Sequence, residues 1–311
     1  MSAATTERTT VLEQLDGLSI EQPEVQPAVA PAAAHRGRIN SMIRSLNFSL
    51  VLAWVVIGVV IAWALLPGIF TSADPLQGIA AQKLRAPSTE HIFGTDAIGR
   101  DLYSRVVHGS INSLSGAFLA VTVGLVLGTL IGVAAGSLGP RVDAVLMRIV
   151  DVLLAVPALL LALSIIILLG PGTLNTAIAV GIGSVAAFAR LTRSEVLKVG
   201  RLDFVEAAYA SGGRRISVLA RHVLPNSLGP VASLAAMQFG TAILAISTLG
   251  FLGYGSPPPT PEWGLLIAEG RKYIATSWWL TTIPGLIVVA VVLSANRISQ
   301  SLGNTRNGVT R

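Results

Sequence analysis

The chain has 311 residues, of which 52% are hydrophobic and only 12% charged, about half the charged share of an average soluble protein. It contains no cysteine, which excludes a disulfide framework, a thiolate zinc site and a cysteine nucleophile. The net charge of +6 would suit nucleic acid only on a soluble face, and here the charges fall between long apolar runs. The sequence therefore predicts a multi-pass membrane protein without a nucleic-acid partner.

Residues 1–45 are polar, lack a sustained periodicity and predict a disordered tail. Six apolar runs follow, and a hydrocarbon core needs about 20 residues per helix: Leu46–Leu66, Leu114–Leu138, Ala144–Leu169, Leu174–Ala189, Pro230–Leu252 and Trp278–Ala295. Pro157 predicts a kink in the third run, and Pro171-Gly172 a tight turn before the fourth. The sequence thus predicts six spans in a bilayer.

The positions of lysine and arginine predict the orientation of these spans. With the amino terminus in the cytoplasm, four basic residues lie in the tail, two after the second span, seven in the long loop and three at the carboxyl end. That is 16 inside, against six outside: Lys83, Arg85, Arg100, Arg105, Arg271 and Lys272. Because basic residues concentrate on the cytoplasmic side, both termini are expected there.

Small residues recur every four positions along the second span, at Gly116, Ala120, Gly124, Gly128, Gly132 and Gly136. Such a stripe lets another helix approach closely enough for good van der Waals contact in lipid. Packing within the same bundle is the favoured interpretation, and an interface with another subunit is the alternative.

About forty residues, 190–229, separate the fourth and fifth spans. Apolar and small residues first recur at helical spacing from Phe204 to Ser211, and Gly212-Gly213 then interrupts them. A second one-sided helix follows, which Pro225 is expected to stop. The loop is therefore predicted to be a short helix, a glycine turn and another short helix.

Within this loop, Glu206-Ala207-Ala208 is followed by Gly212 and then by Leu224-Pro225, twelve residues after that glycine. This pattern resembles the EAA loop of ABC importer permeases, which in that family is a coupling helix seated in a cleft of the cytoplasmic ATPase. His222 departs from the aliphatic residue usual two positions before the leucine. The segment Arg221–Asn226 nevertheless looks like the dipeptide/oligopeptide branch, whose relatives also carry nickel.

Two external stretches resemble the C-type subunits of the same branch. The first contains Phe93-Gly94-Thr95-Asp96 and continues to Arg105, and the second runs from Gly253 to Arg271. The carboxyl end departs, because Ile298–Arg311 lacks the acidic pattern common in those subunits. The resemblance covers roughly residues 46–303.

The resemblance implies an all-α type I ABC importer permease fold with six spans. It places the first span and an external segment at 46–109, the transmembrane core at 110–302 with the coupling loop 190–229, and a cytoplasmic tail at 303–311. The implied function is uptake of di- or oligopeptides across the cytoplasmic membrane of a prokaryote. Implied partners are a second permease subunit, two ATP-binding subunits and an external substrate-binding protein. Nickel, haem, glutathione and oligosaccharides remain alternative cargoes.

No phosphate-binding loop of the type Gly-x-x-x-x-Gly-Lys-Ser/Thr occurs, so ATP and magnesium are expected on partner chains and this chain is not expected to be an enzyme. The four histidines are scattered and show no metal-ligand spacing, so no metal site is expected. The external segment Phe93–Arg105 suits tight turns, with contact to the binding protein as the alternative.

Asp151 lies eight residues beyond Asp143, about 12 Å into the third span. An acid at this depth needs a partner or a water-filled cavity. Arg148 lies three residues earlier on the same face and is the expected structural partner, with a role in the translocation path or in ion coupling as the alternative. Ion coupling would define a secondary transporter, but the two matching halves typical of that class are missing from the sequence. A membrane-embedded enzyme has only this pair as a candidate.

Overall fold

The computed structural model describes residues 48–307, which form helices and connecting loops without a β-strand. The predicted tail 1–45 and the last four residues of the predicted tail 303–311 lie outside the described residues. Residues up to Asn307 belong to the last helix, so the predicted second tail begins as a continuation of that helix. An all-α fold is confirmed.

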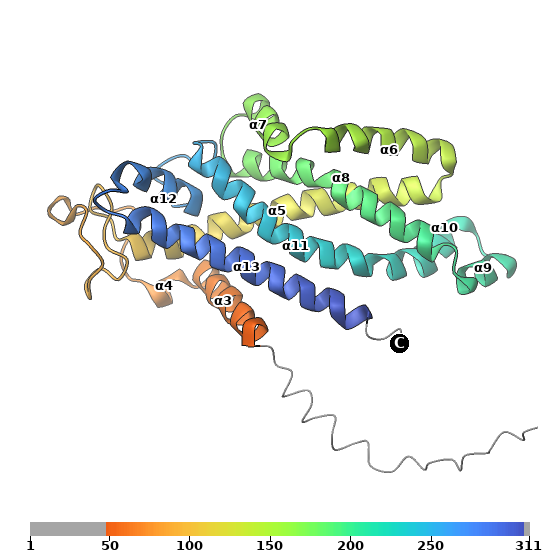
Figure 1. Cartoon of the computed structure of the whole chain (residues 1–311), viewed down its shortest axis with the longest axis horizontal. Helices are drawn as coiled ribbons and strands as arrows, with labels where there is room; N and C mark the ends of the chain where they lie inside the picture. The colour runs from red at the N-terminus through yellow and green to blue at the C-terminus, as the bar shows by residue number, and fades with distance from the viewer. Residues whose placement is uncertain (1–47, 308–311) are drawn as a thin grey trace, which may run out of the picture. The chain divides into compact units, whose positions relative to one another are not determined.

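Most of the described chain consists of long helices (Figure 1). In chain order the α-helices, long and short, are α3 Phe48–Leu65, α4 Pro67–Phe70, α5 Leu102–Ser137, α6 Pro140–Ala155, α7 Ala158–Leu169, α8 Thr173–Val199, α9 Asp203–Ala210, α10 Arg215–Val218, α11 Leu224–Phe251, α12 Trp263–Gly270 and α13 Trp279–Asn307. Within 48–307, five continuous helical segments are long and apolar enough to cross a membrane, and α6 with α7 forms a sixth, bent candidate.

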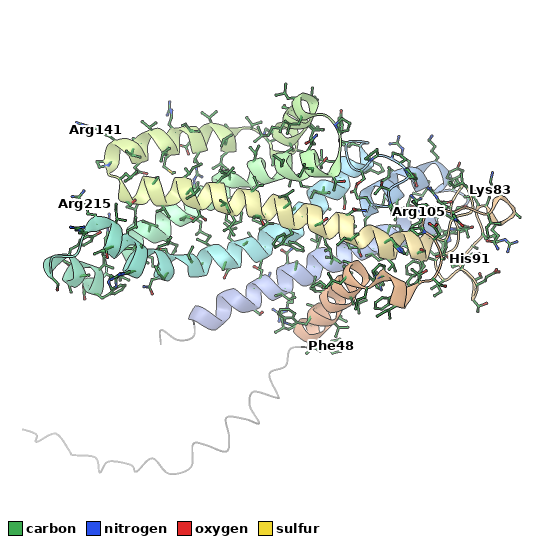
Figure 2. All side chains as sticks on the ribbon, turned by 180° about the vertical axis from the view of Figure 1, so that it is seen from behind. Phe48, Lys83, His91, Arg105, Arg141 and Arg215 are labelled. Carbon is green, nitrogen blue, oxygen red and sulfur yellow. The ribbon has the colours of Figure 1, made fainter. Side chains whose placement is uncertain are left out.

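The elongated bundle has two distinct ends. Helices α9 and α10 lie at one end, and α12 lies at the other with the irregular segment that joins α4 to α5 (Figure 1). Arg141 and Arg215 mark the first end, which we call the α9 end, and Lys83 and His91 mark the second, the α12 end (Figure 2). The sequence predicts that the α9 end faces the cytoplasm.

The glycine stripe of α5 packs along α8, and each successive glycine faces residues about one helical turn further along α8. A Cβ added at Gly128 would lie 2.6 Å from the carbonyl oxygen of Val185, and one at Gly132 would lie 2.6 Å from the Cβ of Thr192. Real Cβ atoms do not come that close, so both helix backbones are in direct contact. The predicted packing within the bundle is confirmed for this stripe.

The third span is broken rather than kinked. Helix α6 ends at Ala155, Val156 is extended, and α7 starts after Pro157 at 94° to α6. Proline lacks the backbone N–H that would continue the helix, and its ring forces the preceding residue out of the helical region. The sequence prediction of a kink at Pro157 therefore understated the change in direction.

Pro225 does not stop the second helix of the long loop, so that prediction is wrong. The chain passes from α10 through a π-helical turn, Leu219–Val223, into α11 without leaving the helix. In that turn the N–H of Leu224 donates to the carbonyl of Leu219, five residues back. The wider turn makes room for the proline ring, whose missing N–H falls in the first turn of α11. Helix α8 likewise continues to Val199, so the loop between the long helices is only residues 200–214.

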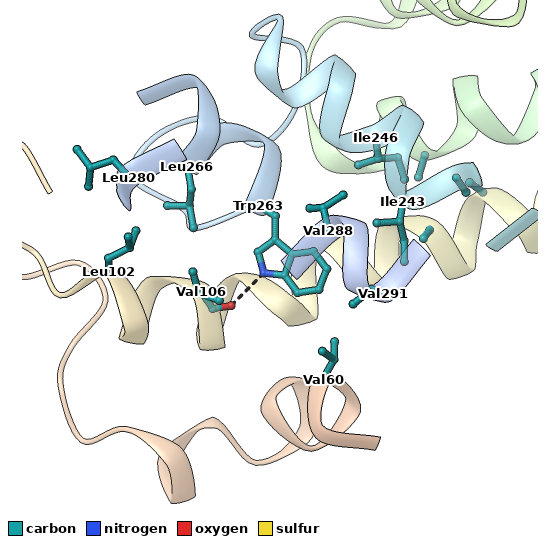
Figure 3. Close-up of a cluster of buried hydrophobic side chains, with 14 of the residues drawn as sticks. Val60, Leu102, Val106, Ile243, Ile246, Trp263, Leu266, Leu280, Val288 and Val291 are labelled. Atoms are coloured by element: carbon teal, nitrogen blue, oxygen red, sulfur yellow. Dashed lines mark hydrogen bonds between the residues drawn. The ribbon is translucent and has the colours of Figure 1, made fainter. Parts of the chain in front are cut away.

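A buried core around Trp263 fastens the α12 end to the spans (Figure 3). The Trp263 ring is fully buried, and its Nε1 donates to the carbonyl oxygen of Val106 on α5 at 3.1 Å. Apolar side chains of α3, α5, α11 and α13 surround it, including Val60, Ile243, Ile246, Val288 and Val291. Burying so large a ring contributes more than any neighbouring aliphatic residue, so this core fixes the position of α12.

Candidate functional site

Helix α9 ends in a tight glycine turn. The N–H of Gly212 donates to the carbonyl of Tyr209 at 2.9 Å, and that of Gly213 donates to the carbonyl of Ala208 at 3.0 Å. This pair of bonds is the Schellman motif, in which the first residue beyond the cap takes a left-handed conformation. Gly212 has φ of +84°, which glycine adopts without a Cβ penalty. The predicted glycine turn is thus present where the sequence places it.

One side of α9 stands on a small apolar cluster. Val205 is fully buried and packs with Val196 and Val199 of α8 and with Val218 and Val223 beyond the turn. The cluster holds the short helix against the ends of two long helices. Helices α8 and α11 both continue from this cluster into the bundle, so the cluster connects α9 to two long helices.

The opposite side of α9 is exposed. Glu206 and Ala207 both face outward, Ala208 is half-buried against the cluster, and Phe204 is 44% exposed. Glu206 forms no ion pair within residues 48–301, and it lies in the first turn, where the helix dipole favours an acid. Four arginines before and after α9 in the chain are also exposed: Arg201, Arg214, Arg215 and Arg221. An exposed helix side that combines apolar residues with the acids Asp203 and Glu206, close in the chain to several arginines, suits a protein partner.

The other two residues of the predicted site belong to α11 rather than to a loop. Leu224 is half-buried and Pro225 is exposed, and both follow the π-helical turn. Both residues therefore form the start of α11. A role in coupling to the ATPase stays a prediction for all six residues of the predicted site: Glu206, Ala207, Ala208, Gly212, Leu224 and Pro225.

Asp151 does not pair with Arg148, so the expected structural pair is wrong. Its Oδ1 accepts a hydrogen bond from Nη2 of Arg190 on α8 at 2.6 Å, whereas Arg148 is exposed elsewhere on α6. A second ion pair also joins α6 to α8, nearer the α9 end. There the guanidinium of Arg193 donates two hydrogen bonds to Asp143. Periodicity along α6 could not reveal partners that lie 39 and 50 residues away on another helix.

An ion network at the α12 end was missed by the sequence analysis. Asp96 accepts from Nε of Arg100 at 2.6 Å and from Nη1 of Arg105 at 3.0 Å, and Nη1 of Arg105 also donates to Glu269 at 2.6 Å. Asp96, Arg100 and Arg105 are all buried. The expected tight turn is also present, since Oδ1 of Asp96 caps the N–H groups of Ile98 and Arg100. The network ties the first external segment to α12.

Replacing Glu269 with glutamine should lower the stability of the folded chain. It leaves the two arginines with one negative charge, and a hydrogen bond to a charged group is worth about 1.5–3 kcal/mol. We expect a lower thermal midpoint in detergent, measured by tryptophan fluorescence. The matched control is Glu90→Gln, because Glu90 is exposed and its ion pair with Arg85 is long, at 3.9 Å, and therefore weak. Equal midpoints for both variants would contradict a structural role of the network.

Glu262 is a second charged residue that sequence analysis did not single out. Its side chain is fully buried, its Oε2 accepts from the N–H of Ser256 at 3.1 Å, and its Oε1 has no hydrogen-bond partner among the described residues. Gly250 and Gly255 line its pocket so closely that no side chain would fit at either. Burial raises the pKa of this carboxyl above its ordinary value of 4.5.

This raised pKa predicts a pH-dependent stability. The folded state holds the proton more tightly than the unfolded state, so the contribution of Glu262 is fully present below pH 4.5 and is lost as pH rises through the folded-state pKa. The variant Glu262→Gln stays neutral. Its thermal midpoint relative to the wild type should therefore rise between pH 4.5 and 8, and each kcal/mol shifts the midpoint by about 2–4 °C. A constant difference across that range would contradict the prediction.

The comparisons with known proteins agree with this architecture. Residues 124–304 match the family model "binding-protein-dependent transport system inner membrane component". The chain is similar to the dipeptide transport system permease protein DppC of Alkalihalophilus pseudofirmus, with 41% identity over 77% of this chain and 79% of that protein. It is also similar to the di/tripeptide transport system permease protein DppC of Pseudomonas aeruginosa, with 41% identity over 70% and 72%.

Solved structures show the same fold. An inward-facing MetNI methionine ABC transporter matches with a TM-score of 0.53 and 18% identity, over 64% of this chain and 96% of the solved chain. Fold and matches together define a transmembrane permease subunit of an ABC importer, a multi-pass membrane protein of a prokaryote. The chain belongs to the family of binding-protein-dependent transport system inner membrane components and works with other ABC components.

Proposed function

We propose that this chain is the permease subunit of an ATP-driven importer that carries di- or oligopeptides across the cytoplasmic membrane. The support is its membership of the family and its 35–41% identity to relatives named for dipeptide and peptide transport. The expected partners are a second permease, two ATP-binding subunits and an external substrate-binding protein. ATP and magnesium would bind to the ATP-binding subunits.

Helix α9 is the element that carries the proposed mechanism. Its exposed side, with Glu206 and Ala207, would sit in a cleft of an ATP-binding subunit, and the carboxylate of Glu206 would pair with an arginine there. Its buried side rests through Val205 on the ends of α8 and α11. Movement of the ATP-binding subunits would therefore turn both long helices and open the transport passage to one side of the membrane at a time.

Purification of the tagged chain from its native membrane tests this assembly. We expect a second permease and two ATP-binding subunits to accompany it, and the isolated chain to bind no ATP, because it has no phosphate-binding loop. Stoichiometric ATP binding by the chain alone would contradict the proposal. Uptake by vesicles that contain only this chain and an ion gradient would favour a secondary transporter instead.

Cargo is a separate question, because one relative is named a glutathione transport system permease, GsiD of Pectobacterium atrosepticum, at 37% identity over 70% of this chain. Competition between unlabelled and labelled cargo in reconstituted vesicles distinguishes a dipeptide transporter from a glutathione transporter. We expect unlabelled alanyl-alanine to suppress uptake of labelled alanyl-alanine more strongly than glutathione does. The reverse order, with high uptake of labelled glutathione, would assign the chain to the glutathione relatives.

A further inference from the structure

A hollow of about 270 Å³ opens between α5, α7, α8 and α11, inside the length of the spans. Most of its wall is apolar, but α11 contributes Gln238, Thr241 and Thr248 at spacings of three and seven residues, which lie on one face of that helix. Thr248 donates to the carbonyl of Leu244 in its own helix. The half-buried Gln238 amide has no hydrogen-bond partner in the described part of the chain. Such an amide is costly against lipid and needs water or a polar neighbour.

The side of α8 that lines this hollow also carries Arg190, which forms an ion pair with Asp151. Gly183 lines the hollow, and Arg190 follows it by seven residues on the same face, about 10 Å along the helix. Arg190 and its partner Asp151 are each 57% exposed at the side chain, although both belong to membrane-crossing segments. Charges that stay exposed within a membrane-crossing helix face a water-filled space or a partner, because lipid would expel them.

These observations converge on one surface. We propose that Gly183, Arg190 and Asp151, with Gln238, Thr241 and Thr248, form one wall of the aqueous passage through which the cargo crosses, and that the Asp151–Arg190 pair sets the electrostatic potential of its end nearer α9. This inference rests on the proposed transport function. A neutral pair of opposite charges offers a carboxylate to an amino terminus and a guanidinium to a carboxyl terminus, so it suits a zwitterionic peptide.

This chain has no native cysteine, so a thiol introduced into it can be followed by the labelling of this subunit alone. Single cysteines are introduced as Gln238→Cys and Thr241→Cys in the complete transporter and are treated with a water-soluble methanethiosulfonate reagent. The control is Val55→Cys, since Val55 is 55% exposed at the middle of α3 but has only apolar surroundings. We expect labelling at least tenfold faster at the two wall positions. Rates as slow as the control would overturn the proposal.

The role of the charged pair has a second readout. Ala187→Cys places a thiol one turn from Arg190, and its labelling is compared between a positively and a negatively charged reagent. Asp151→Asn leaves Arg190 unpaired and should favour the negative reagent at least threefold, whereas Arg190→Gln should favour the positive one. General loosening of the fold cannot change the ratio of the two labelling rates in opposite directions in the two variants. Equal ratios in both variants would mean that the pair only joins α6 to α8.

Failure of this inference differs from failure of the proposed function. A transporter that takes up alanyl-alanine with ATP while both wall cysteines label as slowly as the Val55→Cys control has its passage elsewhere. A chain that labels rapidly but supports no ATP-driven uptake of any tested peptide keeps its aqueous wall and loses the proposed cargo.

Discussion

Gly212→Val should lower ATP-driven peptide uptake by at least tenfold while the spans remain folded. Gly212 sits at φ of +84° in the turn after α9, and a Cβ atom added there would have no neighbouring atom within 4 Å. The obstacle is therefore the backbone conformation itself, which costs a non-glycine residue about 1–2 kcal/mol and more for a β-branched one. A turn forced out of this conformation moves α9 relative to the cluster around Val205.

The matched control is Gly212→Asn, because asparagine adopts positive φ more readily than other non-glycine residues. It adds a side chain at the same site and should keep most of the uptake. Both variants are measured in reconstituted vesicles for peptide uptake and for ATP hydrolysis stimulated by loaded binding protein. If valine and asparagine reduce uptake equally, the conformation of the turn is not what the site requires.

Glu206→Lys tests the exposed side of the same helix. A charge-assisted contact to a partner is worth about 1.5–3 kcal/mol, which corresponds to a factor of ten or more in binding. Because Glu206 has no ion-pair partner within residues 48–301, its reversal should cost the fold little beyond the favourable helix-dipole interaction and should chiefly weaken the proposed contact with the ATP-binding subunit. Unchanged stimulation of ATP hydrolysis would mean that α9 is only a connector.

Gly128→Leu should have the largest effect on folding. The Cβ alone would lie 2.6 Å from the carbonyl oxygen of Val185, and the remaining atoms of leucine would push α5 and α8 apart. Overpacking of a close helix contact costs about 1–3 kcal/mol and sometimes more. We expect little folded protein in the membrane, with a lowered thermal midpoint for whatever is recovered in detergent.

Gly58→Leu is the control for this substitution. Gly58 lies in α3, and a Cβ there meets no atom within 4 Å, so the same leucine should be accepted at nearly wild-type yield. Size-exclusion profiles and thermal midpoints of the two variants give the comparison. Similar yields would show that α5 and α8 can separate without loss of the fold, contrary to the packing described above.

The amino-acid sequence by itself determined the membrane class, the approximate positions of the spans, the close packing of the α5 stripe and the glycine turn after α9. These features depend on local information: apolar length, small residues at fixed spacing, and a residue type that tolerates positive φ. The pattern from Glu206 to Pro225 is local as well and could be found in the sequence, while its role in coupling stays a prediction.

Only the tertiary structure decided which charges meet. Asp151 pairs with Arg190, and Arg105 joins Asp96 to Glu269 on α12, across separations that no helical periodicity encodes. The π-helical turn before Pro225 and the 94° break at Pro157 were also beyond the sequence. A proline forbids one hydrogen bond in either place, and whether the chain then bends away or widens its helix depends on the neighbours available to pack against it.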